Sequence, residues 1–211
     1  MNEADKNEII GRYESRLSEF GHDVRTLASG SDSKQKIRYR TLLDIRIAGG
    51  EKVLDIGCGF GDFFGFLRDE GVDVVYSGYD IVPGLLDEAR KMYPKARFEL
   101  RDIQENPPAE VFDWVVSSQA FNNRLKYEDN SDLVRNVLQI AFGACRKGMA
   151  IDMMSSHVDF REDRLYYFDP AEMFDFAKGL TRWVTLRHDY LPYEFCLYLY
   201  RNSPIQPFLG V

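Results

Sequence analysis

The sequence is poor in the residues that build metal sites and disulfide frameworks. Its 211 residues include three cysteines, Cys58, Cys145 and Cys196, and three histidines. The cysteines form no Cys-x-x-Cys pair and the histidines show no His-x-x-x-His spacing, so the pattern indicates neither a zinc site nor a disulfide framework. We therefore expect no bound metal, and unpaired cysteines of this kind fit a reducing, cytoplasmic location.

Long apolar runs and an excess of basic residues are also missing. No apolar stretch approaches the roughly 20 residues that span a bilayer, and the N-terminal MNEADKNEII has neither the apolar core of a secretory signal nor the arginines of a transit peptide. The formal net charge is -7, and the densest basic stretch, residues 34–40, is typical of a solvated helix face. Because nucleic-acid surfaces need clustered Lys and Arg, we expect neither a membrane nor a nucleic acid as partner.

What is present fits one globular domain, with 45% hydrophobic and 29% charged residues. Apolar residues at helical spacing predict helices over residues 3–20 and about 33–47. Strands are then predicted over residues 51–56, 73–79, 96–100, 112–117 and 148–154, and helices between them over residues 62–70, 84–92 and 130–145. Such alternation predicts a mostly parallel sheet with helices on both faces.

The C-terminal part departs from this alternation. A helix is predicted at about residues 170–178, with Asp169 as its N-cap and Pro170 in its first turn. Strands over residues 182–189 and 194–201 follow, joined by the four residues 190–193. So short a connection makes an antiparallel pair.

A glycine-rich turn follows the first predicted strand. Residues 57–61 read Gly-Cys-Gly-Phe-Gly, and a helix opens at Asp62. Glycines let the backbone approach a ligand closely, and ligands of open parallel sheets lie beyond the carboxyl ends of the strands. Asp62 stands where the dinucleotide fingerprint has its third glycine, and its charge would oppose a pyrophosphate. A nicotinamide-dependent oxidoreductase is therefore disfavoured.

Acidic residues stand at successive strand ends beside this turn. Asp55 precedes the first glycine, Asp80 ends the second predicted strand, and Asp102 ends the third. Asp55 can face a cationic ligand, Asp80 can accept hydrogen bonds from two ribose hydroxyls, and Asp102 can accept from an adenine amino group, with Ile103 packing on the ring. One such acid often only caps a strand, but three beside a glycine loop favour S-adenosylmethionine, a nucleoside with a sulfonium.

Residues 51–154 resemble the class I S-adenosylmethionine-dependent methyltransferases. Residues 53–61, Val-Leu-Asp-Ile-Gly-Cys-Gly-Phe-Gly, resemble the first motif of that family, and residues 112–118 its fourth-strand motif. The resemblance implies a Rossmann-like α/β three-layer sandwich whose seven-stranded sheet is mostly parallel, with an antiparallel last strand. It also implies S-adenosylmethionine as cofactor and S-adenosylhomocysteine as product.

We predict a single domain, residues 1–211, that consists of three parts. Residues 1–50 are expected to form a helical cap, residues 51–154 the cofactor-binding core, and residues 155–211 the acceptor side. The expected cofactor contacts are Tyr13, Arg38, Asp55, Gly57, Cys58, Gly59, Gly61, Asp80, Ile81, Asp102, Ile103 and Gln119.

Three of these residues have competing interpretations. Arg38 can pair with a cofactor carboxylate through its planar fork, or lie solvated on a helix surface. Tyr13 can line the site or pack in the core. Gln119 lies just after the fourth strand, where it and Asn122 can touch the sulfonium end or the acceptor, although Asn122 is as well explained by turn hydrogen bonding.

The acceptor is expected to be a small molecule, methylated on oxygen or nitrogen. The end of the fourth strand lacks the Asp/Asn-Pro-Pro-aromatic motif of methyltransferases that act on nucleobase amines. Aromatic residues at 166–168, 190 and 193 can line an acceptor pocket or instead close the core. The alternative function is a protein that binds the cofactor without transferring a methyl group.

A base is needed if the acceptor must lose a proton. His188 and His157 are the candidates, because histidine titrates near neutral pH. His157 follows the predicted strand 148–154 and His188 lies near the end of the predicted strand 182–189, and both strands end at the expected rim. A structural role is the competing interpretation for each histidine. Asp189 points to the opposite face of its strand from His188, so it is a poor orienting partner.

Overall fold

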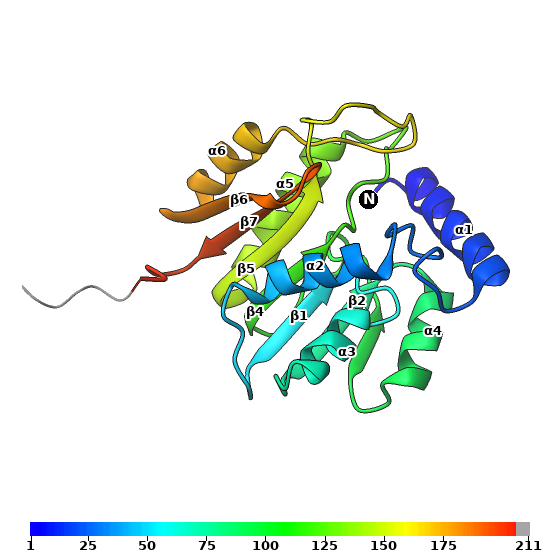
Figure 1. The fold of residues 1–211 in the computed structure, drawn as a ribbon, viewed down its shortest axis with the longest axis horizontal. Coiled ribbons are helices and arrows are strands. Elements are labelled where there is room, and N and C mark those ends of the chain that lie inside the picture. Colours follow the sequence, from blue (N-terminus) through cyan, green and yellow to red (C-terminus); the bar gives the residue numbers. More distant parts are fainter. Residues whose placement is uncertain (206–211) are drawn as a thin grey trace, which may run out of the picture.

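A seven-stranded sheet organises residues 1–205, the part of the chain that the computed structural model describes (Figure 1). The strand order is β3-β2-β1-β4-β5-β7-β6. Neighbours from β3 to β5 are parallel, whereas β7 is antiparallel to both β5 and β6. The strands are β1 (Lys52–Ile56), β2 (Val75–Asp80), β3 (Arg97–Leu100), β4 (Phe112–Ser118), β5 (Cys145–Met154), β6 (Trp183–Leu191) and β7 (Glu194–Tyr200).

Helices cover both faces of the sheet, and one more helix lies beside its carboxyl end (Figure 1). Two hydrophobic clusters show which helix packs on which face: α2, α3 and α4 pack on one, and α5 and α6 on the other. The helix α1 packs on α4. The helices are α1 (Glu3–Phe20), α2 (Asp32–Leu43), α3 (Asp62–Asp69), α4 (Pro83–Met92), α5 (Asn130–Gly143) and α6 (Pro170–Leu180).

The predicted fold class is confirmed, including the antiparallel β7 and a β6 that runs parallel to β5. Asp169 caps α6 as predicted, since its carboxylate accepts from the N–H groups of Ala171 and Glu172 at 2.8 and 3.2 Å. None of the helices in residues 1–205 combines the length and the apolarity needed to cross a membrane.

Two predicted boundaries are wrong by three residues or more. The helix α2 ends at Leu43 and not near residue 47, because Arg46 takes a left-handed φ of 79°. Ile45 and Ile47 are nevertheless buried and prolong the apolar pattern that suggested a longer helix. The strand β5 begins at Cys145, where the prediction extends the preceding helix, because Cys145 pairs with Phe112 of β4.

Buried polar contacts fix α1 over the carboxyl ends of the strands. The carboxylate of Asp5, 2% exposed, accepts from three successive backbone N–H groups, those of residues 126, 127 and 128, at 2.8, 3.1 and 3.1 Å. At the other side of the helix, Glu14 accepts from the N–H of Gly84 at 2.8 Å. The apolar side chains Ile10, Tyr13 and Leu17 pack between these contacts on a small cluster centred on Phe60.

We expect Asp5→Ala to destabilise the protein. Three N–H donors would lose their acceptor, and a buried unsatisfied donor costs about 1–3 kcal/mol, so the expected loss is about 2–4 kcal/mol after partial hydration. Urea unfolding followed by circular dichroism measures it. The control is Glu19→Ala on the same helix, where the side chain is exposed. Equal stability of the two variants would contradict an anchoring role for Asp5.

Candidate functional site

A cavity lies where the carboxyl ends of β1, β2 and β4 meet the N-terminal segment. Its empty volume, including the part open to solvent, is about 1100 Å³. The sheet side contributes Asp55, the glycine loop and residues 79–82 and 118–121, while Tyr13, Leu27 and Arg38 line the cavity from the N-terminal segment. A ligand there would lie between the sheet and α1.

The glycine loop is held tightly against the neighbouring loop. Gly57 has a φ of 73°, and a Cβ added to it would lie 2.3 Å from the Cβ of Ala120. The N–H groups of Gly57 and Cys58 both donate to the carbonyl of Tyr79, at 2.8 and 3.1 Å. Gly59, with a φ of 54°, faces the side chain of Leu27. The backbone of residues 57–59 therefore forms part of the cavity wall itself.

Asp80 lines the cavity and also shapes the loop. Its two carboxylate oxygens accept from the N–H groups of Gly59 and Val82, at 2.8 and 2.9 Å. Burial raises the pKa of this carboxyl group, while the backbone hydrogen bonds oppose the shift. Each oxygen keeps a further lone pair, so the residue can cap its strand and still accept from a ligand.

Asp102 and Ile103 lie at the other end of the lining. One oxygen of Asp102 accepts from the N–H of Gln104 at 3.0 Å, and the other lies 3.2 Å from the Met1 ammonium and 3.8 Å from Nζ of Lys6. Ile103 is buried, at 4% exposure. Asp102 and its sequence neighbour Ile103 therefore both line the cavity.

Asp55 is a buried acid without a positive partner. Within residues 1–205, no Lys, Arg or His nitrogen forms an ion pair with its carboxylate, and its hydrogen bond comes from the Tyr76 hydroxyl at 2.5 Å. Burial, with the charges of Asp80 and Asp152 adding to it, raises the pKa of Asp55 to about 7. A buried carboxylate that lines a cavity in this state favours a cationic occupant.

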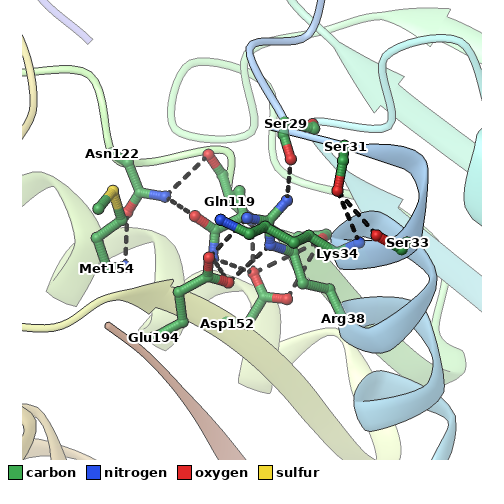
Figure 2. Close-up of polar contacts among 11 residues, drawn as sticks. Ser29, Ser31, Ser33, Lys34, Arg38, Gln119, Asn122, Asp152, Met154 and Glu194 are labelled. Carbon is green, nitrogen blue, oxygen red and sulfur yellow. Dashed lines mark hydrogen bonds and ion pairs between the residues drawn. The ribbon is translucent and has the colours of Figure 1, made fainter. Parts of the chain in front are cut away.

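Arg38 is buried and already holds an acid. Its Nε and Nη2 donate to the two oxygens of Glu194, each at 2.6 Å, and its Nη1 donates to the carbonyl of Ser29 at 2.8 Å (Figure 2). The hypothesis of a solvated helix position is therefore wrong. The planar fork that was expected to take a cofactor carboxylate faces Glu194, although Arg38 does line the cavity.

Gln119 connects this ion pair to a second buried acid (Figure 2). Its backbone N–H and its side-chain Nε2 both donate to Asp152, at 2.7 and 2.9 Å, and Nε2 also lies 3.1 Å from Glu194. Asn122 donates to the side-chain oxygen of Gln119. These bonds hold Gln119 at a left-handed φ of 57°, which is uncommon for a residue with a side chain.

Asp152 and Glu194 were missed by the sequence analysis. Asp152 stands two residues before the end of β5, so the strand-end rule that identified Asp80 could have found it. Glu194 opens the antiparallel β7, and therefore lies at the rim where the parallel strands end. Finding Glu194 required knowing the pairing of β7 with β5.

Other expected residues lie elsewhere. His157 and His188 are neighbours, with ring centroids 6.1 Å apart, and His188 packs on Phe195, but neither histidine is part of the cavity lining. Burial, and secondarily His157, lowers the pKa of His188. Gly61 does not line the cavity either. It precedes α3 with a φ of 74°, where a Cβ would lie 2.7 Å from Phe98.

The expected aromatic acceptor pocket is not formed by the residues proposed for it. Tyr167 and Phe168 are buried, with 6% and 1% exposure, and Phe168 belongs to the core beneath α5 and α6. Tyr190 packs on the core of the opposite face. Within residues 1–205, no group of three or more His, Cys, Asp or Glu side chains is arranged to hold a metal ion.

Comparison with known proteins identifies the family. A family model described as a methyltransferase domain matches residues 53–141. A protein of Mycobacterium tuberculosis that is named as a methyltransferase is 30% identical over 154 residues, which are 71% of this chain and 92% of that protein. The chain belongs to the class I S-adenosylmethionine-dependent methyltransferases.

Other relatives of this methyltransferase match a shorter part of the chain or share its fold. The malonyl-[acyl-carrier protein] O-methyltransferase of Acetivibrio thermocellus is 32% identical over 92 residues, covering 41% of this chain and 32% of that enzyme. The fold matches the DhpI–SAH complex, with a TM-score of 0.71 and 16% identity over 97% of this chain and all of that one. It also matches the magnesium protoporphyrin IX methyltransferase of Synechocystis with bound SAH, with a TM-score of 0.65, 13% identity and coverage of 94% and 100%.

We expect Gly57→Ala to destabilise the methyltransferase and to close part of its cavity. The new Cβ would lie 2.3 Å from that of Ala120, at a φ of 73° that disfavours a side chain. The expected cost is about 1–3 kcal/mol. Thermal unfolding measures it, with Gly11→Ala as control, because no atom lies within 4 Å of a Cβ there. An unchanged midpoint for Gly57→Ala would contradict the tight contact.

Asp55→Asn should change how stability depends on pH. The native pKa of Asp55, about 7, exceeds the ordinary 3.8, so this group's contribution to stability is full below about pH 4 and is lost as pH rises through 7. The variant lacks this loss. Its free energy of unfolding should therefore fall less than that of the wild type over the same pH range.

Urea unfolding at several pH values tests this expectation. The control is Asp175→Asn, which changes an exposed carboxylate on α6 and should run parallel to the wild type. A parallel profile for Asp55→Asn as well would show that Asp55 is ionised at its ordinary pH in the native protein.

Proposed function

We propose that this methyltransferase binds S-adenosylmethionine in the cavity and transfers its methyl group to oxygen or nitrogen of a small-molecule acceptor. The observation that carries the proposal is the pairing of a glycine loop with buried acids that lack a positive partner. The burial of an unpaired carboxylate is costly, and a ligand with a permanent positive charge reduces that cost. When bound, the cofactor supplies a methyl carbon already activated by positive sulfur.

The lining residues fit such a ligand. In this assignment the free lone pairs of Asp80 accept from the ribose hydroxyls, with Ile81 and Cys58 beside them. Asp102 and Ile103 receive the adenine. The backbone of Gly57 and Gly59 forms the floor, and Asp55 and Gln119 border the charged end, with Arg38 and Tyr13 on the opposite wall. All the residues of this assignment line the same cavity.

The contribution of the protein to the reaction is mainly positioning. Methyl transfer is an in-line displacement, and holding two reactants in line can supply roughly 7–11 kcal/mol. The glycine loop and the N-terminal segment enclose the site from two sides and limit the access of water. Because His157 and His188 lie outside the cavity lining, the proposal gives neither of them a proton-transfer role.

Charge and the names of relatives support a small-molecule acceptor. The net charge of -7 disfavours a nucleic acid. One relative is named for O-methylation of a malonyl group on acyl-carrier protein, and one structural neighbour for methylation of magnesium protoporphyrin IX. These names belong to those proteins, and the first of them favours O-methylation as the first reaction to test.

The remaining expectations follow the same proposal. Residues 1–50 act as a cap on the cofactor-binding core within one domain, because eight residues from Met1 to Tyr39 line the cavity. The three cysteines are buried and unpaired, which fits a cytoplasmic protein.

Calorimetry with S-adenosylhomocysteine tests the cofactor. We expect a dissociation constant in the micromolar range and a loss of at least tenfold in Asp80→Ala, because that change removes the acceptor of the Gly59 N–H as well as the ribose contact. Asp87→Ala is the matched control, since Asp87 is an exposed acid on the adjoining helix. Absence of binding by the wild type would overturn the proposal.

Transfer itself requires a second measurement. The protein is incubated with methyl-labelled cofactor and fractionated small metabolites, and products are identified by mass spectrometry. Labelled product that depends on Asp80 is the expected result. Tight binding with no labelled product in any fraction would favour the alternative, a protein that binds the cofactor without methyl transfer.

A further inference from the structure

Asp152 is a buried acid for which the assignment above leaves no role. It is 0% exposed and lies on β5, near the carboxyl ends of the strands. It accepts from the hydroxyl of Ser118 at 3.2 Å. It also accepts from both the backbone and the side chain of Gln119 (Figure 2). Ser118 and Gln119 line the cavity. The carboxylate therefore lies one side chain behind the cavity wall.

We propose that Asp152 is a specificity-determining residue that favours the sulfonium cofactor over its neutral thioether product. The inference rests on the proposed function, and it adds a basis for discriminating between two ligands of nearly the same shape. S-adenosylmethionine carries a positive charge on sulfur, which S-adenosylhomocysteine lacks. A fixed negative charge close to the wall distinguishes the two by charge alone.

The charges around Asp152 leave it uncompensated. Arg38 of α2 is the nearest cationic residue that influences Asp152, but its fork is held by both oxygens of Glu194. Within residues 1–205, no nitrogen of Lys, Arg or His forms an ion pair with Asp152. The negative charge of Asp152 therefore remains available to a cation in the cavity.

Several titratable groups face Asp152 from the elements packed around it. They are Arg38 and Tyr39 of α2, Asp55 of β1, Tyr190 of β6, and Glu194 and Cys196 of β7. Apart from Arg38, none of these side chains carries a positive charge in either of its protonation states. None of them can therefore neutralise the carboxylate of Asp152. Tyr190 presents a buried hydroxyl with no hydrogen-bond partner among the described residues.

Asp55 and Asp152 flank the same strand end. They lie on β1 and β5, the two neighbours of β4 in the sheet, and Gln119 follows β4 between them. Burial first, and then the charge of Glu194, raises the pKa of Asp152 to about 7, while Arg38 opposes the shift. A cation in the cavity would favour the ionised form of both acids, so its binding should release protons near neutral pH.

The reaction then has an electrostatic consequence. Methyl transfer removes the positive charge from sulfur, so the cavity loses the partner of its acids when the product forms. The acids either take up protons or repel one another. In both cases the interaction that favoured the substrate form is lost, so the thioether product is held less strongly than the sulfonium substrate.

The test compares dissociation constants for S-adenosylmethionine and S-adenosylhomocysteine by calorimetry at pH 8. In Asp152→Asn the preference for the sulfonium ligand should fall by roughly three- to tenfold, the size expected for one charge acting through a partly shielded interior. Binding of the thioether should change little. The control is Asp175→Asn, which removes a charge on exposed α6 and should leave the preference unchanged.

The pH dependence gives a second readout that needs no variant. From pH 6 to pH 8 the wild-type preference for the sulfonium ligand should rise, because Asp152 ionises near pH 7. Calorimetry in buffers of different ionisation enthalpy should show more protons released by the sulfonium ligand than by the thioether. In Asp152→Asn the part of this difference that remains belongs to Asp55.

The outcomes separate this inference from the proposed function. If neither ligand binds the wild type, the proposed function fails. If both bind, but the preference and the proton release are the same in the wild type and Asp152→Asn, the role of Asp152 is overturned. If Asp152→Asn does not fold, equal proton release by the two ligands in the wild type overturns it instead.

Discussion

Negative charge buried at the carboxyl ends of the strands is the constraint on which the site depends. Asp55, Asp80, Asp152 and Glu194 are each less than 9% exposed. Buried carboxylates require hydrogen-bond donors or cations, and these four acids differ in which of the two they have. Glu194 forms an ion pair with Arg38, and Asp80 accepts hydrogen bonds from two backbone N–H groups. Asp55 and Asp152 accept hydrogen bonds but have no cationic partner within residues 1–205. We infer that the buried acids without a cation would give the cavity a preference for a positively charged ligand.

Glu194 and two further acids, Asp5 and Glu14, hold the N-terminal segment in place. The Arg38–Glu194 pair ties α2 to β7, and Asp5 and Glu14 fix α1 to the loops before α5 and at the start of α4. These contacts set the position of Tyr13 and Leu27 over the glycine loop. The cavity is therefore enclosed by polar contacts at its rim, while the two apolar cores below determine the sheet that supports it.

Much of this fold could be predicted because its signals are local. Alternating strands and helices, the short connection before β7 and the cap at Asp169 are all visible in stretches of a few residues. The end of α2 was predicted wrongly because buried apolar residues continue beyond the helix. The start of β5 was predicted wrongly because pairing with β4 determines it. The histidines appeared suitable because their strands end at the right rim, but His188 packs on Phe195 and His157 packs beside His188, and neither lines the cavity.

By itself the sequence determined the glycine loop, the acids at the carboxyl ends of β1, β2 and β3, and hence the class of ligand. These features lie within short segments, where the order of residues fixes their position at a strand end. The tertiary structure alone decided the partners. Arg38 meets Glu194 across 156 positions because β7 begins beside the end of β5, and Gln119 meets Asp152 across 33 because β4 pairs with β5. The pairing of the strands therefore decides which buried acid has a counter-ion.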